Sequence, residues 1–193
     1  MAAAAKHREA LLAASVRLFR QKGYAATGLA EILAESGAPK GSLYHYFPGG
    51  KAEIGAEAVA LAGNTVAHTL EELAAEADGP GELMARYLDL MAGWMAASDF
   101  RDGSPITTTL LETVPEHEAI RQAGADAFDA WAGVLTESAV AAGIPLARAE
   151  SLARFAISAL EGALIQCRVA GNAAPLRLVA EELGALYAAA QTR

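Results

Sequence analysis

The sequence predicts an all-α protein with a small three-helix N-terminal head and a larger helical body, about nine helices in total. Alanine, the strongest helix former, supplies 48 of the 193 residues. Aromatic residues, which favour strands, make up only 6%. Apolar residues recur every three or four positions, without strand-like alternation, between breaks rich in glycine and proline. The composition, 53% hydrophobic and 20% charged, excludes a disordered chain.

Three short helices are predicted in the head. The first covers residues 4–22, ends at Gly23 and carries an apolar stripe formed by Leu11, Leu12, Ser15, Val16, Leu18 and Phe19. Thr27 is expected to cap a second helix that ends near Gly37. Pro39 suits the first position of a third helix, which ends at Pro48.

The body is predicted to contain longer helices separated by loops with glycine or proline. Their expected spans are 51–77, 81–98, 106–113, 116–143, 146–171 and 175–190. We therefore expect two domains, a head over residues 1–50 and a body over residues 51–193.

Charge divides at nearly the same point. The net charge of the chain is -8, yet residues 1–51 hold seven basic and three acidic side chains, a net charge of +4. The remaining residues therefore carry a net charge of -12. A basic head on an acidic body suits a protein whose head meets a polyanion. Chance clustering of charges is the alternative explanation for this division.

The segment over residues 27–47, TGLAEILAESGAPKGSLYHYF, has the spacing of a helix-turn-helix. Leu43 and Phe47, four residues apart, are expected to face inward. The polar side chains left for display are Lys40, Ser42, Tyr44, His45 and Tyr46. Each alone could be a core aromatic or a solvated charge, but three successive polar aromatics cannot all point into one core. Gly41 would let the backbone approach a major groove closely.

These residues carry a family resemblance. The head resembles that of TetR-type transcriptional regulators, because fifteen residues fall at positions where that family has the same residue types. They are Arg8, Leu12, Ala14, Leu18, Phe19, Gly23, Tyr24, Thr27, Ile32, Gly37, Gly41, Leu43, Tyr44, Phe47 and Lys51. The string SLYHYFPGGK resembles the LmrA/YxaF branch of that family, and DGSPITTTLLE resembles the second signature of the branch. Ser104 replaces a cysteine usual there, and Pro39 replaces a capping serine or threonine.

The resemblance implies a homodimer that binds double-stranded DNA at a near-palindromic operator and represses an adjacent promoter until a small effector releases it. It implies base contacts from Lys40 and Gly41. The residues expected to hold phosphates are Thr27, Ser42, Tyr44, His45, Tyr46 and Lys51. A transcriptional activator of the same fold, or a helical module that binds protein or a small molecule and does not act on DNA, is the alternative.

The body would supply the dimer interface and the effector site. Small residues on helices 146–171 and 175–190 permit close packing in a four-helix interface, although the same residues could form the core of a monomer. The expected interface residues are Leu152, Phe155, Ala156, Ala159, Gly162, Ala163, Gln166, Leu178, Leu183, Leu186 and Tyr187. The candidate contacts for an apolar effector are Met91, Trp94, Met95, Thr108, Leu110, Phe128, Trp131 and Cys167.

Signs of an enzyme are missing from the sequence. It contains no HExxH, GxSxG or GxxxxGK motif, and Cys167 is the single cysteine. Glu116, His117 and Glu118 are adjacent on a helix start and point in different directions, so we expect no metal and no cofactor. No segment reaches the ~18 apolar residues of a membrane span, and charges interrupt the N-terminal helix, so we expect a cytoplasmic protein without a membrane partner.

Overall fold

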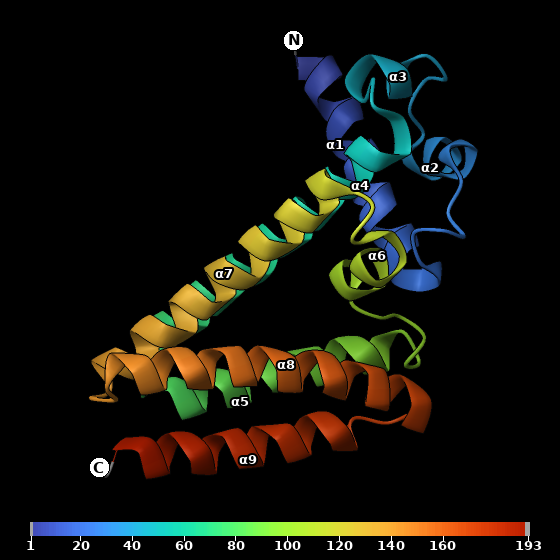
Figure 1. The fold of residues 1–193 in the computed structure, drawn as a ribbon. Coiled ribbons are helices and arrows are strands. Elements are labelled where there is room, and N and C mark those ends of the chain that lie inside the picture. The colour runs from blue at the N-terminus through green and yellow to red at the C-terminus, as the bar shows by residue number, and fades with distance from the viewer. Residues whose placement is uncertain (1, 192–193) are drawn as a thin grey trace. The chain divides into compact units, whose positions relative to one another are not determined.

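The computed structural model describes residues 2–191, which form α-helices and no strands (Figure 1). The predicted all-α class is confirmed. The nine helices of the described residues are α1 (Ala2–Lys22), α2 (Leu29–Ser36), α3 (Ser42–Tyr46), α4 (Gly50–Glu76), α5 (Pro80–Ala97), α6 (Pro105–Thr113), α7 (Glu118–Ala141), α8 (Leu146–Ala170) and α9 (Ala174–Gln191). From α4 onward their ends agree with the predicted ends to within two residues.

The chain folds into two compact units. The head unit combines Met1–Gly63 with Ser104–Ala127, and the body unit combines Asn64–Gly103 with Phe128–Arg193. The head unit therefore holds α1 to α3, the first half of α4, α6 and the start of α7. The predicted division into a DNA-binding domain over residues 1–50 and a body domain over residues 51–193 stays a prediction.

The head unit is organised around α1, which packs against α2, α3 and α6. Its core includes large side chains with no solvent exposure, among them Leu11, Phe19, Ile32, Leu43, Phe47 and Ile54. Burial of each such side chain stabilises the unit by about 1.5–3 kcal/mol. The stripe predicted on α1 is confirmed at Leu11, Leu12, Leu18 and Phe19, all of which are buried.

Two predicted helix starts in the head are wrong. α2 begins at Leu29 with Gly28 at its N-cap, because the Thr27 hydroxyl is buried and donates to the Gly23 carbonyl at 2.7 Å. α3 begins at Ser42, not at Pro39. The amide and hydroxyl of Ser42 donate to the Pro39 carbonyl at 2.9 and 2.6 Å, which closes a turn before the helix.

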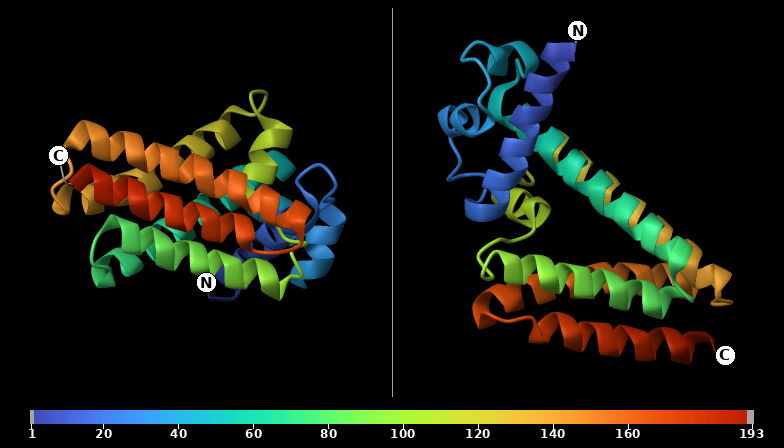
Figure 2. Two further views of the ribbon diagram at one scale, coloured as in Figure 1. Left: turned by 90° about the horizontal axis from the view of Figure 1, so that it is seen from below. Right: turned by 180° about the vertical axis from the view of Figure 1, so that it is seen from behind.

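The body unit is built on α5, α8 and α9, which run side by side (Figure 2). Gly81 on α5 faces Gly184 on α9, since a Cβ at Gly81 would lie 3.6 Å from the Gly184 Cα. These two small residues let the helices approach closely. None of the helices among residues 2–191 is both long and apolar enough to cross a bilayer.

Candidate nucleic-acid interface

Helix α3 is buried on one side and exposes polar side chains on the rest of its surface. Leu43 and Phe47 have no exposed surface, so α3 is fixed to the head unit on one face, as predicted. Tyr44 is 64% exposed, and the neighbouring His45 is exposed as well. Tyr46 is half-buried, with its ring 4.8 Å from the His45 ring in an edge-on arrangement. A helix of five residues depends on such tertiary anchors because it is too short to form alone.

The turn before α3 is open to solvent. Lys40 and Gly41 are exposed, and a Cβ at Gly41 would meet no atom within 4 Å. Internal packing therefore does not explain the glycine at this position. Ser42 is half-buried, and its hydroxyl is held by the Pro39 carbonyl.

Most of the head's basic side chains with a partner in the structure form ion pairs inside the unit. Arg8 pairs with Glu57 and stacks over the Phe47 ring at 5.3 Å, which ties α1 to α3 and α4. Arg17 pairs with Glu35, and Lys22 pairs with Glu31. Among the described residues Lys40 has no ion pair, so its charge is available at the surface beside α3.

Two of the residues expected to hold phosphates, Thr27 and Lys51, are less exposed than we expect for a phosphate contact. Burial leaves the Thr27 hydroxyl no access to a phosphate in this conformation, because it is used to hold the Gly23 carbonyl. Lys51, in the first turn of α4, is half-buried. Its Nζ donates to the Ala25 carbonyl at 3.3 Å and lies 4.4 Å from the centre of the Tyr24 ring. Burial lowers the Lys51 pKa, and the negative charge of Glu112 partly opposes this shift.

Glu112 is a residue of the head unit to which the sequence assigned no role in DNA binding. Its carboxylate, near the end of α6, accepts the Ala25 amide hydrogen across 87 positions of sequence. The only sequence signal for it was the glutamate of the DGSPITTTLLE segment. The carboxylate therefore contacts the loop that leads into the first helix of the helix-turn-helix.

The predicted effector contacts are divided between the two compact units. Thr108 and Leu110 lie on α6 in the head unit, where the Thr108 hydroxyl donates to the Ser104 carbonyl at 2.9 Å and Leu110 packs on Gly124. The other candidates belong to the body unit, where Met91, Trp94 and Phe128 are half-buried and Met95, Trp131 and Cys167 are buried.

Trp131, one of the predicted contacts, lines a small void in the body unit. The Phe128 ring meets Trp131 edge-on at 5.3 Å, and the void beside Trp131 has a volume of about 10 Å³. Such a volume holds at most one water. Tyr87 borders the same void, and its pKa is raised because burial and the nearby negative charge of Glu161 disfavour the phenolate. Trp131 and its neighbours thus form core in this conformation.

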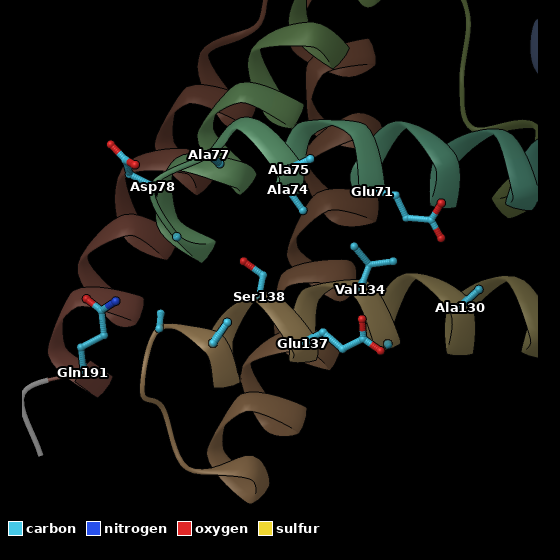
Figure 3. Close-up of a pocket in the computed structure, with 14 residues that line it drawn as sticks. Glu71, Ala74, Ala75, Ala77, Asp78, Ala130, Val134, Glu137, Ser138 and Gln191 are labelled. Atoms are coloured by element: carbon cyan, nitrogen blue, oxygen red, sulfur yellow. The ribbon is translucent and has the colours of Figure 1, made fainter.

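A larger groove lies elsewhere in the body unit. It has a volume of about 960 Å³ and is lined by α4, α7 and the end of α9 together with the loop after α4 (Figure 3). Alanines form much of its wall, and Glu71, Asp78 and Glu137 place carboxylates around it. None of the predicted effector contacts lines this groove.

The predicted dimer stripe is wrong in part, because it mixes core with surface. Leu152, Ala156, Ala163, Leu183 and Tyr187 are buried within the body unit, where the packing of α5, α8 and α9 covers them. The large apolar side chains that α8 and α9 do expose include Phe155 (52% exposed), Ile165, Val169 (86%) and Leu178.

Potential metal and nucleophile positions have structural explanations. No group of three His, Cys, Asp or Glu side chains in the part of the chain that the structure describes could hold a metal ion. Glu118 pairs with Arg121, whose hydrogen bonds lower the Glu118 pKa, while the neighbouring His117 ring faces Tyr24 at 6.5 Å. Cys167 is fully buried in α8.

Comparison with known proteins gives the same assignment for both ends of the chain. Residues 11–58 match the family model "Bacterial regulatory proteins, tetR family", and residues 80–182 match "Transcriptional regulator LmrA/YxaF-like, C-terminal domain". An HTH-type transcriptional regulator of Mycobacterium tuberculosis is 38% identical over 181 residues, covering 91% of each chain. YxaF of Bacillus subtilis is 34% identical, covering 93% of this chain and 94% of its own.

Further relatives agree. LmrA of Bacillus subtilis, an HTH-type transcriptional regulator, is 32% identical, covering 88% of this chain and 90% of its own. The crystal structure of regulatory protein TetR from Rhodobacter sphaeroides superposes with a TM-score of 0.80 at 24% identity, covering 91% of this chain and 96% of that one, and shows the same fold. The relatives are transcriptional regulators, not enzymes. The chain therefore belongs to the TetR family of DNA-binding transcriptional regulators, within its LmrA/YxaF-like group.

Proposed function

We propose that the protein is a cytoplasmic homodimeric repressor that binds a near-palindromic operator at an adjacent promoter and dissociates when a small apolar effector binds its body. The observation that carries this proposal is the set of exposed polar side chains on α3 and in the turn before it. Leu43 and Phe47 anchor the helix, while Tyr44, His45 and the preceding Lys40 face solvent from a basic head. A short anchored helix with exposed donors suits entry into a major groove.

Within that groove the residues would divide into two classes. Lys40 and Gly41 would meet base edges, because they begin the recognition element and nothing in the head covers them. Ser42, Tyr44, His45, Tyr46 and Lys51 would hold phosphates with hydroxyl, imidazole and ammonium donors. We propose no phosphate contact for Thr27, because its side chain is buried.

Dimerisation would use the exposed apolar side chains of α8 and α9. Phe155, Ile165 and Val169 leave apolar surface on α8, and Leu178 does so on α9. Two-fold pairing through this surface would present two heads to successive major grooves, with half-site centres about 34 Å apart or slightly more.

Effector release requires that the ligand prefer a body shape whose heads do not fit the operator. The body is acidic overall, with a net charge of -12 beyond residue 51, and its groove carries three carboxylates. This charge favours a neutral or cationic apolar compound over an organic anion.

A selection from random DNA duplexes, followed by sequencing of the retained molecules, tests the proposal. We expect a near-palindromic sequence and, from light scattering at micromolar concentration, a dimer. Transcription in vitro from a promoter carrying that sequence should fall when the protein is added. Asymmetric sequences, a monomer, or a rise in transcription would contradict the corresponding part of the proposal.

A further inference from the structure

The backbone of Ala25 links the loop between α1 and α2 to helices α4 and α6. The amide hydrogen of Ala25 is accepted by the Glu112 carboxylate of α6, and the carbonyl of Ala25 accepts a hydrogen bond from Lys51 Nζ of α4 at 3.3 Å. Ala25 itself lies in the loop between α1 and α2. All of these residues belong to the head unit, so the contacts lie within one compact body.

Two glycines leave room for the junction formed by Ala25, Glu112 and Lys51. Gly23 has a φ of +87°, and a Cβ at this position would fall on Glu112 Oε1. Gly55 of α4 lies against Tyr24, since a Cβ there would come within 2.8 Å of Tyr24 Cε2. A side chain at either position would push Glu112 or Tyr24 away, so the backbone itself is shaped for the junction.

The junction holds the Lys51 side chain in a half-buried position. Its ammonium lies over the Tyr24 ring and is bonded to the Ala25 carbonyl. The Glu112 carboxylate, on the amide side of Ala25, adds attraction for the same ammonium, which is why its charge opposes the lowering of the Lys51 pKa by burial. An ammonium that moved to a DNA phosphate would have to give up part of these interactions.

We propose that Glu112 is a positioning residue for DNA binding, which holds the Lys51 ammonium on the loop between α1 and α2 in competition with a DNA phosphate. The affinity of the head for DNA then depends on the position of α6, which carries Glu112. This inference rests on the phosphate contact proposed for Lys51. It adds a residue from outside the helix-turn-helix to the control of DNA binding.

The experiment compares charge-neutral variants of nearly equal shape in the full-length protein. Glu112→Gln keeps an oxygen that can accept the Ala25 amide hydrogen and removes the charge. Glu116→Gln is the matched control, because Glu116 is an exposed carboxylate of the same unit that takes no part in the junction. Lys51→Met removes the ammonium, and the double variant Glu112→Gln with Lys51→Met completes a double-mutant cycle.

The readout is the Kd for a duplex recovered from the random selection, measured by fluorescence anisotropy at several salt concentrations. Glu112→Gln should bind about two- to fivefold more tightly, the range of a partly exposed charge interaction. Glu116→Gln should change the affinity much less. In the Lys51→Met background, Glu112→Gln should have no further effect. Thermal unfolding of each variant should show that the fold is retained.

Equal gains from Glu112→Gln and Glu116→Gln would overturn the proposal, because the effect would then be that of charge in general. An undiminished gain in the Lys51→Met background would overturn it as well. If Lys51→Met weakens binding while Glu112→Gln changes nothing, the positioning role alone is wrong. If Lys51→Met leaves both the affinity and its salt dependence unchanged, the proposed phosphate contact is wrong and the positioning role is wrong with it.

Discussion

Replacing Phe47 with alanine should unfold the recognition helix before it affects the body unit. Phe47 has no exposed surface, its ring lies under the Arg8 guanidinium at 5.3 Å, and it fixes the end of a helix with only five residues. A buried Phe→Ala change costs about 3–5 kcal/mol, and loss of a cation–π contact adds about 0.5–1 kcal/mol. A small domain has only about 5–15 kcal/mol of stability in total, so the head unit would lose a large part of its own.

The matched control lies on the same helix. Tyr44→Ala removes an aromatic side chain that is 64% exposed, so it should change stability by no more than about 0.5 kcal/mol. Urea unfolding measures the free energy of each variant, and hydrogen exchange followed by mass spectrometry locates the loss. We expect fast exchange in residues 42–47 of Phe47→Ala and unchanged protection in α8 and α9. Equal stabilities for the two variants would refute the assignment of Phe47 as the anchor of α3.

Three further predictions concern single positions. Lys51→Ala should reduce the slope of log Kd against log salt by about one without changing base preference, as loss of one phosphate contact requires; a slope equal to that of the wild type would contradict it. Gly23→Ala should destabilise the head more than Gly37→Ala in urea unfolding, because both have positive φ (+87° and +64°) but only the new Cβ at Gly23 meets Glu112. Tyr187→Phe should stabilise the body unit by about 1–2 kcal/mol at neutral pH, because the buried hydroxyl has no hydrogen-bond partner among the described residues. Burial raises the Tyr187 pKa to about 12, so the wild type should lose stability as the pH rises from about 10 to 12, because the unfolded chain releases this proton first. Tyr187→Phe should lose less stability over this range in pH-dependent melts, and the loss that remains comes from Tyr87, whose pKa burial also raises.

Periodicity was sufficient to predict the helices, because buried and exposed positions alternate along α1 and α3 with helical spacing. Leu43 and Phe47 are buried and Tyr44 is exposed as this spacing requires. Local signals were less reliable at helix ends. Thr27 and Pro39 both resemble starting residues, but each serves the loop before the helix instead, one through its hydroxyl and the other through its carbonyl.

Contacts between distant segments could not be read from the sequence. Glu112 reaches Ala25 across 87 positions, and no local pattern marks such a pair. The sequence also does not show that the effector candidates are divided between the two units, with Thr108 in the head unit and Trp131 in the body unit. On α8 a small-residue stripe suits a helix interface of either kind, and the structure shows Ala156 and Ala163 packed inside the body unit.

The central claim is that the exposed α3 and the turn before it read DNA. The measurement that tests it most directly is the random-duplex selection performed in parallel on the wild type and on Lys40→Ala, whose side chain is exposed beside α3. We predict that the wild type selects a near-palindrome and that Lys40→Ala selects the same sequence with preference relaxed at one base pair in each half-site, at a cost of about 1–3 kcal/mol per site. A uniform loss of affinity with every base preference intact would contradict the base-reading role of Lys40, and identical selections at unchanged affinity would contradict the placement of this turn on DNA.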